Sequence, residues 1–195
     1  MANAKFYEQL KNIRAEDKFP NQELEKQIID KIFPKDAEEL SLKLSNVTAG
    51  FYGFVLKNVG KQCGWDKVDS ISKSLFIELG QLKTIEAQEK CIDIPKDTRA
   101  LAIIFISAVY TSSPEYKFEI FKLTPEETLM RIFGASRYYR IAKELNIETH
   151  ISWPVLIPFF EGIARQVGIE CKIEIDSKIL ENNGRYNYLA RFILI

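Results

Sequence analysis

The hydrophobic period of the chain changes at Pro114, and this change limits the fold more than any other feature of the sequence. Before Pro114, apolar residues recur at spacings of three and four, which is typical of amphipathic helices. After it, Tyr116, Phe118 and Ile120 alternate with charged residues, which is typical of a strand with one buried face. Helices followed by strands predict an α+β fold.

The part before Pro114 is predicted to be entirely helical. The expected helices cover residues 5–16, 22–33, about 36–61, 66–90 and a segment that begins near Pro95 and runs through Val109. The last of these is apolar nearly all round, so we expect it in the core. Two prolines and a charged run in residues 17–35 predict a boundary between a helical N-terminal appendage, residues 1–35, and a single domain, residues 36–195.

The part after Pro114 predicts four strands and two helices. The expected strands begin at Tyr116, at Leu129, at Ile169 and at Tyr186, and the expected helices cover residues 136–146 and 153–167. The order β-β-α-α-β-β predicts an antiparallel four-stranded sheet covered by helices on one side. Residues 186–195 are apolar enough to be placed inside that sheet.

Composition excludes several classes of protein. The 195 residues carry 27 basic and 27 acidic side chains, so the chain lacks the net positive charge expected of a nucleic-acid-binding protein. No apolar stretch approaches the roughly 20 residues of a membrane span. The first ten residues lack the hydrophobic region of a signal peptide, so we expect a cytoplasmic protein.

Metal binding is not expected either. Cys63, Cys91 and Cys171 are far apart, and neither they nor His150 stand at the spacing of zinc ligands. The odd number of cysteines argues against a disulfide framework. The sequence identifies no cofactor.

Aromatic residues are abundant, with 13 Phe, 8 Tyr and 2 Trp. Pockets for small molecules are lined mostly by apolar and aromatic side chains. We therefore predict an apolar cavity between the long helix, the helix that follows Trp153, and the sheet. The candidate ligand-binding residues are Phe51, Phe54, Trp65, Phe105, Trp153, Phe160 and Glu161. The alternative is that these side chains form an ordinary core.

Two glycines, Gly50 and Gly53, lie in the middle of the predicted long helix. Each costs a helix about 1 kcal/mol relative to alanine, which suggests a close approach of another element or of a ligand. We hypothesise that this stretch lines the binding site. Ordinary helix–helix packing through small residues is the alternative.

Only a small number of polar side chains in the sequence are candidates for a catalytic role. Glu161 stands four residues before Arg165, the spacing of an ordinary ion pair, and His150 lies in a predicted loop without a neighbouring catalytic partner. The cluster Arg137-Tyr138-Tyr139-Arg140 is interpreted as a solvated helix face with aromatic stems packed beneath it, and an anion clamp is the alternative. The sequence contains no phosphate-binding loop, nucleophile elbow or dinucleotide fingerprint. A non-catalytic function is therefore favoured.

Several segments resemble a known family. They are Tyr-Lys-Phe-Glu-Ile-Phe at 116–121, Leu-Met-Arg-Ile-Phe at 129–133, the helical segments 137–147 and 159–169, and a closing β-hairpin. Three earlier segments, 50–54, 64–65 and 78–80, look like the helical half of the same proteins. Over residues 40–195 the chain resembles the L-2-amino-thiazoline-4-carboxylic acid hydrolase-like proteins and the wider group of 4-vinyl reductase-type ligand-binding domains.

This resemblance implies a ligand-binding domain, and it transfers no catalytic residue. Members often carry cysteines at three places, where this chain has Gly134-Ala135-Ser136, Ser152-Trp153 and a Gly184 to Tyr188 ending without cysteine. If those cysteines serve chemistry or metal binding, this chain lacks it. We therefore expect a cytoplasmic domain that binds a small hydrophobic molecule.

Two alternative functions, each of a different class, stay open. One is a hydrolase of a small heterocyclic or amide substrate, which needs Glu161 or His150 at a concave site as its acid–base group. The other is a dimeric scaffold or interaction protein. Residues 186–195 would present an unpaired hydrophobic edge to a second copy if they lay at the margin of the sheet.

Overall fold

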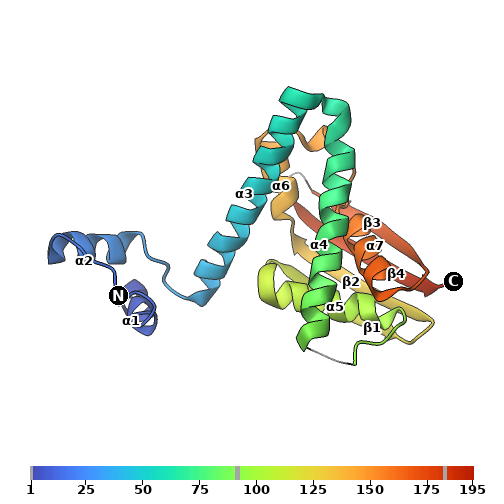
Figure 1. Ribbon diagram of the computed structural model, residues 1–195, viewed down its shortest axis with the longest axis horizontal. Coiled ribbons are helices and arrows are strands. Elements are labelled where there is room, and N and C mark those ends of the chain that lie inside the picture. The colour runs from blue at the N-terminus through green and yellow to red at the C-terminus, as the bar shows by residue number, and fades with distance from the viewer. Residues whose placement is uncertain (1, 91–92, 182–183) are drawn as a thin grey trace. The chain divides into compact units, whose positions relative to one another are not determined.

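The computed structural model describes residues 2–90, 93–181 and 184–195 (Figure 1). Their contacts divide the chain into two units, Met1–Asn46 and Val47–Ile195. This division lies inside the long helix α3 (Ala37–Cys63), whereas the sequence suggested a boundary at residue 35. The two units are described separately.

The first unit contains a pair of short helices, α1 (Ala2–Gln9) and α2 (Gln22–Lys31). The side-chain amide of Asn3 donates a hydrogen bond to the carbonyl of Phe33 at 2.7 Å, just beyond the end of α2. The first helix was expected to continue to residue 16, and this is wrong. The side chain of Ile13 is 78% exposed, so no packing stabilises a helix there, and short helices depend on packing.

The second unit contains the remaining helices. After α3, a short 3-10 turn η1 (Trp65–Lys67) leads into α4 (Val68–Lys90). The later helices are α5 (Arg99–Ser112), α6 (Arg137–Glu144) and α7 (Leu156–Val167), with a 3-10 turn η2 (Glu148–His150) between the last two. Helix α5 carries buried side chains on most of its faces. Its predicted place in the core is confirmed.

The sheet contains β1 (Tyr116–Leu123), β2 (Glu127–Ala135), β3 (Cys171–Leu180) and β4 (Arg185–Leu194). Its order is β1-β2-β4-β3, and every neighbouring pair is antiparallel. The predicted α+β class and four-stranded antiparallel sheet are confirmed. The predicted turn at 182–184 falls largely on residues outside the described part of the chain.

Strand β4 lies inside the sheet, because it pairs with β2 on one side and with β3 on the other. Its predicted interior position is therefore confirmed. The same pairing overturns the proposed route to a dimer, since the backbone groups of this strand are already used within the sheet. The edges of the sheet are β1 and β3.

One face of the sheet is buried beneath helices (Figure 1). Met130 and Ile132 of β2 and Ala190 and Phe192 of β4 have no exposed surface, whereas the residues between them are partly exposed. The ring of Phe160 on α7 lies 4.6 Å from that of Phe192. Side chains that alternate along the strands thus give the sheet one buried face, which forms part of the core, and one face that is partly exposed to solvent.

Helices α4 and α7 touch through their backbones, at Gly80 and Gly162. A Cβ atom at Gly80 would lie 2.2 Å from the carbonyl oxygen of Phe159, and one at Gly162 would lie 2.1 Å from the carbonyl oxygen of Ile77. These distances are too short for any side chain, and a backbone atom cannot move aside as a flexible side chain can. Glycine is therefore required on both helices.

We expect Gly80→Ala and Gly162→Ala each to lower the free energy of unfolding by about 2–3 kcal/mol, because each forces two backbones apart. Gly50→Ala is the matched control. At Gly50 the nearest neighbour of an added Cβ is a side-chain atom of Phe54 at 3.8 Å, so this change should stabilise the protein by about 0.5–1 kcal/mol. Urea denaturation measures all three, and unchanged stability at Gly80 and Gly162 would contradict the packing.

Candidate functional site

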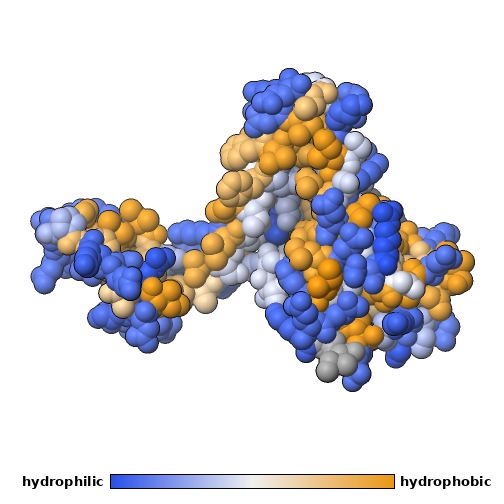
Figure 2. All heavy atoms as spheres, in the orientation of Figure 1, coloured by the Kyte–Doolittle hydropathy of each residue, from blue (hydrophilic) through white to orange (hydrophobic). Residues whose placement is uncertain are grey.

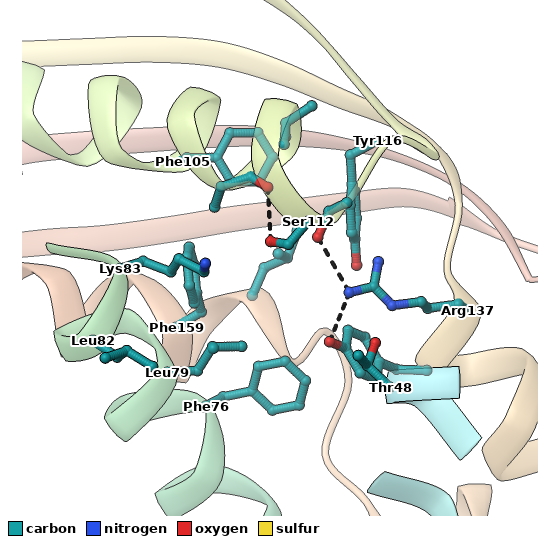
Figure 3. Close-up of a pocket in the computed structure, with 15 residues that line it drawn as sticks. Thr48, Phe76, Leu79, Leu82, Lys83, Phe105, Ser112, Tyr116, Arg137 and Phe159 are labelled. Carbon is teal, nitrogen blue, oxygen red and sulfur yellow. Dashed lines mark hydrogen bonds between the residues drawn. The ribbon is translucent and has the colours of Figure 1, made fainter. Parts of the chain in front are cut away.

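A cavity of about 250 Å³ lies in the second unit between α4, α5, α6 and α7 (Figure 3). Its lining is mostly apolar and aromatic. The lining residues are Thr48, Phe76, Leu79, Leu82, Lys83, Phe105, Ala108, Val109, Ser112, Ser113, Tyr116, Arg137, Tyr138, Leu156 and Phe159. We call this space the inner cavity.

A second space adjoins the inner cavity. This outer groove has a volume of about 280 Å³, and its lining includes Phe51, Val55 and Leu75. Thr48, Phe76, Leu79 and Tyr138 line both spaces. The four shared residues separate the groove from the inner cavity, so the two spaces lie side by side.

The size of the inner cavity limits what it can hold. An apolar cavity of about 150 Å³ accommodates benzene, so about 250 Å³ suffices for one ring with a short substituent. Ligand pockets usually begin at about 300 Å³. A larger molecule would therefore extend beyond the inner cavity.

Arg137 forms a polar end to the inner cavity. The hydroxyl of Ser136 accepts a hydrogen bond from the backbone N–H of Tyr139 at 3.2 Å, so it caps α6 and fixes Arg137 at the first helical position. The Arg137 side chain is only 4% exposed. Figure 3 shows its guanidinium pointing from α6 into the cavity.

The guanidinium is held by several buried partners. Its Nη1 forms an ion pair with Glu115, whose side chain is 8% exposed. Its Nη2 donates to the hydroxyl of Ser113 at 3.2 Å and to that of Tyr138 at 2.9 Å. Together these bonds fix both the position and the plane of the guanidinium.

One hydrogen-bond donor of the Arg137 guanidinium is not used by these partners. Its buried Nε–H has no acceptor among the residues that the structure describes, and the same is true of the buried hydroxyl of Tyr186. Nearly all buried polar groups in proteins are hydrogen-bonded, so such a group requires a specific explanation. The inner cavity therefore combines an apolar wall with an unsatisfied buried donor on a residue of that wall.

The glycine at 134 explains why Glu115 reaches Arg137. Gly134 has a φ of 140°, and a Cβ there would lie 2.3 Å from the carbonyl oxygen of Glu115. Only glycine tolerates both conditions. The start of β1 therefore lies tightly against the end of β2, two residues before α6 begins.

The charges at this end of the cavity balance. Although burial alone would lower the pKa of Arg137, its interactions with Tyr138 and Glu115 raise the pKa, so the guanidinium stays charged. Burial raises the pKa of Tyr116 far above its usual value, so this phenol stays neutral. The site offers hydrogen-bond donors and a neutral ion pair.

Two of the seven predicted site residues line the inner cavity or the outer groove. Phe105, on α5, lines the cavity, and Phe51, on α3, lines the groove with 68% of its surface exposed. Phe160 is fully buried but packs between Phe105 and Phe192 in the core. For Phe160, the alternative interpretation as an ordinary core residue fits its position.

The other four predicted residues lie elsewhere. Phe54 is exposed on α3, and Trp65 stacks on His150 with ring centroids 4.6 Å apart. The indole N–H of Trp153 donates to the carbonyl of Glu148 at 3.0 Å. Glu161 is 43% exposed and lies 4.0 Å from Arg165. The structure does not bring the seven residues into one site.

Sequence reasoning missed the polar end. The interpretation of the cluster at 137–140 as a solvated face with aromatic side chains packed beneath it fits the exposed Arg140 and the buried Tyr138, and it is wrong for the buried Arg137. One signal was present in the sequence. Ser136 is a typical helix N-cap, and it follows directly after a strand, which places the next residue at the edge of the sheet.

The two glycines of α3 have different surroundings. A Cβ at Gly53 would meet the side chains of Leu145 and Ile141 at 2.8 and 2.9 Å, which is helix–helix packing, whereas Gly50 has more space. Neither glycine is among the described residues that line the cavity or the groove, although their neighbours Phe51 and Tyr52 line the groove.

The remaining candidates give no further site. Within residues 2–90, 93–181 and 184–195, no group of three or more His, Cys, Asp or Glu side chains is arranged to hold a metal ion. Burial raises the pKa of the Cys171 thiol, Cys63 is exposed, and Cys91 lies outside the described residues. In the described part of the chain, no helix has the length and apolar character needed to cross a membrane.

Comparison of the chain with models of known protein families, with curated proteins and with solved structures gave no match. The resemblance to the 4-vinyl reductase-type domains therefore stays a prediction.

We expect Arg137→Met to lower the free energy of unfolding by about 3–5 kcal/mol, because it removes the positive charge that pairs with the buried Glu115 carboxylate. The double variant Arg137→Met with Glu115→Met should recover much of that loss, since both charges are then removed. Urea denaturation of wild type, both single variants and the double variant measures the coupling. Additive losses would contradict the buried pair.

Proposed function

We propose that the second unit is a cytoplasmic domain that binds a small, mainly apolar molecule in the inner cavity and the outer groove. The observation that carries the proposal is the inner cavity itself, about 250 Å³ with an apolar wall and one polar end. Natural ligand pockets share this combination, in which apolar walls supply affinity and a few polar groups fix the orientation.

The energetics of the cavity support a ligand. The lining of the inner cavity is mostly apolar, so an apolar molecule that binds there removes apolar surface from water. Each Å² of apolar surface removed from water stabilises the bound state by about 25 cal/mol. The rings of Phe76, Phe105 and Phe159 provide such a surface.

The same geometry favours binding over catalysis. The hydrolase alternative requires Glu161 or His150 at a concave site, but Glu161 pairs with Arg165 at the surface and His150 stacks on Trp65. The polar side chains that line the inner cavity are Arg137, Lys83, which pairs with Glu86 at 2.7 Å, and hydroxyl groups, and no carboxylate or imidazole is among the described residues of the lining to act as a general base.

One observation favours a second candidate function, self-association. Val47, Phe51, Phe54 and Val55 follow one another along α3, and each is between 48% and 68% exposed. Figure 2 shows apolar side chains gathered along this helix. Exposed apolar patches often mark interaction surfaces. A homodimer through α3 replaces the earlier hypothesis of a dimer through the last strand.

Ala108→Phe should abolish ligand binding, because Ala108 lines the inner cavity and a phenyl ring there would fill it. Ile103→Phe is the matched control, since Ile103 lies on the same helix and is already partly exposed. Ligand-observed NMR with indole and ethylbenzene should give at least about tenfold weaker binding for Ala108→Phe than for the control. Equal binding by the two variants would place the ligand elsewhere and contradict the proposal.

A further inference from the structure

We propose that the molecule bound in the inner cavity is an apolar carboxylic acid, bound as its anion, whose carboxylate pairs with the ammonium group of Lys83. This inference rests on the proposed function and adds the chemical class of the ligand. It depends on the position of Lys83 on α4 and on a difference between the two cations of the lining.

The contact between α4 and α7 explains why Lys83 lies in the lining. Lys83 stands three residues after Gly80, so both residues lie on the side of α4 that faces α7. The Lys83 side chain lines the inner cavity and is only 16% exposed. Figure 3 shows it extending from α4 into the cavity, on the side opposite Arg137. The two cations of the lining therefore occupy separate places.

The two cations differ in how firmly their charges are neutralised. Arg137 pairs with Glu115, and both side chains are buried, at 4% and 8% exposed. Lys83 pairs at 2.7 Å with Glu86, three residues further along the same helix, and the Glu86 side chain is 42% exposed. Pairs of this kind at a helix surface contribute little to stability. A ligand carboxylate can therefore replace Glu86, which turns to solvent, whereas it cannot replace Glu115.

The ammonium group of Lys83 also has unused donors. A lysine ammonium carries three N–H groups. One of them donates to Glu86, and no other described residue accepts from Lys83. Among apolar walls, a cation is favoured only when it is paired and hydrogen-bonded. Hydrogen bonds between two charged groups are the strongest of those available, so a carboxylate satisfies this ammonium group better than a neutral oxygen does.

The size of the cavity limits the apolar part of the acid. About 250 Å³ accommodates a single ring with a short substituent. The rings of Phe76, Phe105 and Phe159 line the space beside Lys83 (Figure 3). An acid of the size of phenylacetate combines one ring with a short acidic substituent.

Three probes of similar size separate the contributions of charge and apolar surface. Phenylacetate carries the carboxylate, phenylacetamide has a neutral group of the same shape, and ethylbenzene has no polar group. We expect wild-type protein to bind phenylacetate about tenfold more tightly than phenylacetamide, because only the carboxylate pairs with the Lys83 charge. Ligand-observed NMR titration measures all three affinities.

Two variants and one control locate the carboxylate. Lys83→Met keeps the apolar stem without the charge, so phenylacetate should bind at least about tenfold more weakly while ethylbenzene changes little. Glu86→Gln removes the competing carboxylate, so phenylacetate should bind about threefold or more tightly than it binds wild type. Lys73→Met is the matched control and should change nothing. Lys73 is also on α4 and pairs with Asp69 at 2.7 Å, but it is not among the described residues of the lining.

The outcomes are distinguishable. If none of the three probes binds wild type, the proposed function is wrong. If ethylbenzene binds but phenylacetate binds no more tightly than phenylacetamide, the proposed function stands and the carboxylate inference is overturned. If Lys83→Met leaves the affinity for phenylacetate unchanged, or if Lys73→Met weakens it equally, the carboxylate does not pair with Lys83 and the inference is overturned. Unchanged or weaker binding of phenylacetate by Glu86→Gln would contradict the replacement of Glu86.

Discussion

The backbone contact between α4 and α7 at Gly80 and Gly162 is the constraint on which the rest of the second unit depends. Helix α7 is fixed on the sheet through Phe160 and Phe192, and the glycine contact then fixes α4 on α7. Phe76 lies one turn before Gly80, and its ring lines the inner cavity together with that of Phe159. A close crossing beside large aromatic residues thus leaves a cavity next to the contact, because the helix axes cannot shift to close it.

The polar end of the cavity follows from a second local constraint, the capped start of α6. Ser136 fixes the beginning of the helix, and Gly134 brings the start of β1 close enough for Glu115 to meet Arg137. The buried pair costs desolvation energy, which hydrogen bonds from Arg137 to Ser113 and Tyr138 offset. Nε–H of Arg137 and the hydroxyl of Tyr186 are buried without a hydrogen-bond partner among the described residues.

The sequence predicts the fold better than the site, for a physical reason. Alternation at 116–120 and 169–176 reports which face of a strand is buried, so the sheet, and even the interior place of its last strand, follow from the pattern. The cavity instead depends on how helices are rotated against one another. Phe51 and Phe54 belong to the same apolar pattern of α3, yet of the two only Phe51 lines the groove. On α7, Phe159 lines the cavity, whereas its neighbour Phe160 packs in the core. Arg137 was missed because a charged residue in a first helical turn is usually solvated, and only the tertiary contact with Glu115 buries it.

Native mass spectrometry of the protein purified from its own host tests the central claim, a ligand in the inner cavity, most directly. The account predicts that wild type and Ile103→Phe carry one small, mainly apolar molecule per chain, and that Ala108→Phe, whose added ring occupies the cavity, carries none. The same spectra report whether the chain is a monomer or a dimer. A bound molecule retained equally by Ala108→Phe, or no bound molecule in any of the three proteins, would contradict the account.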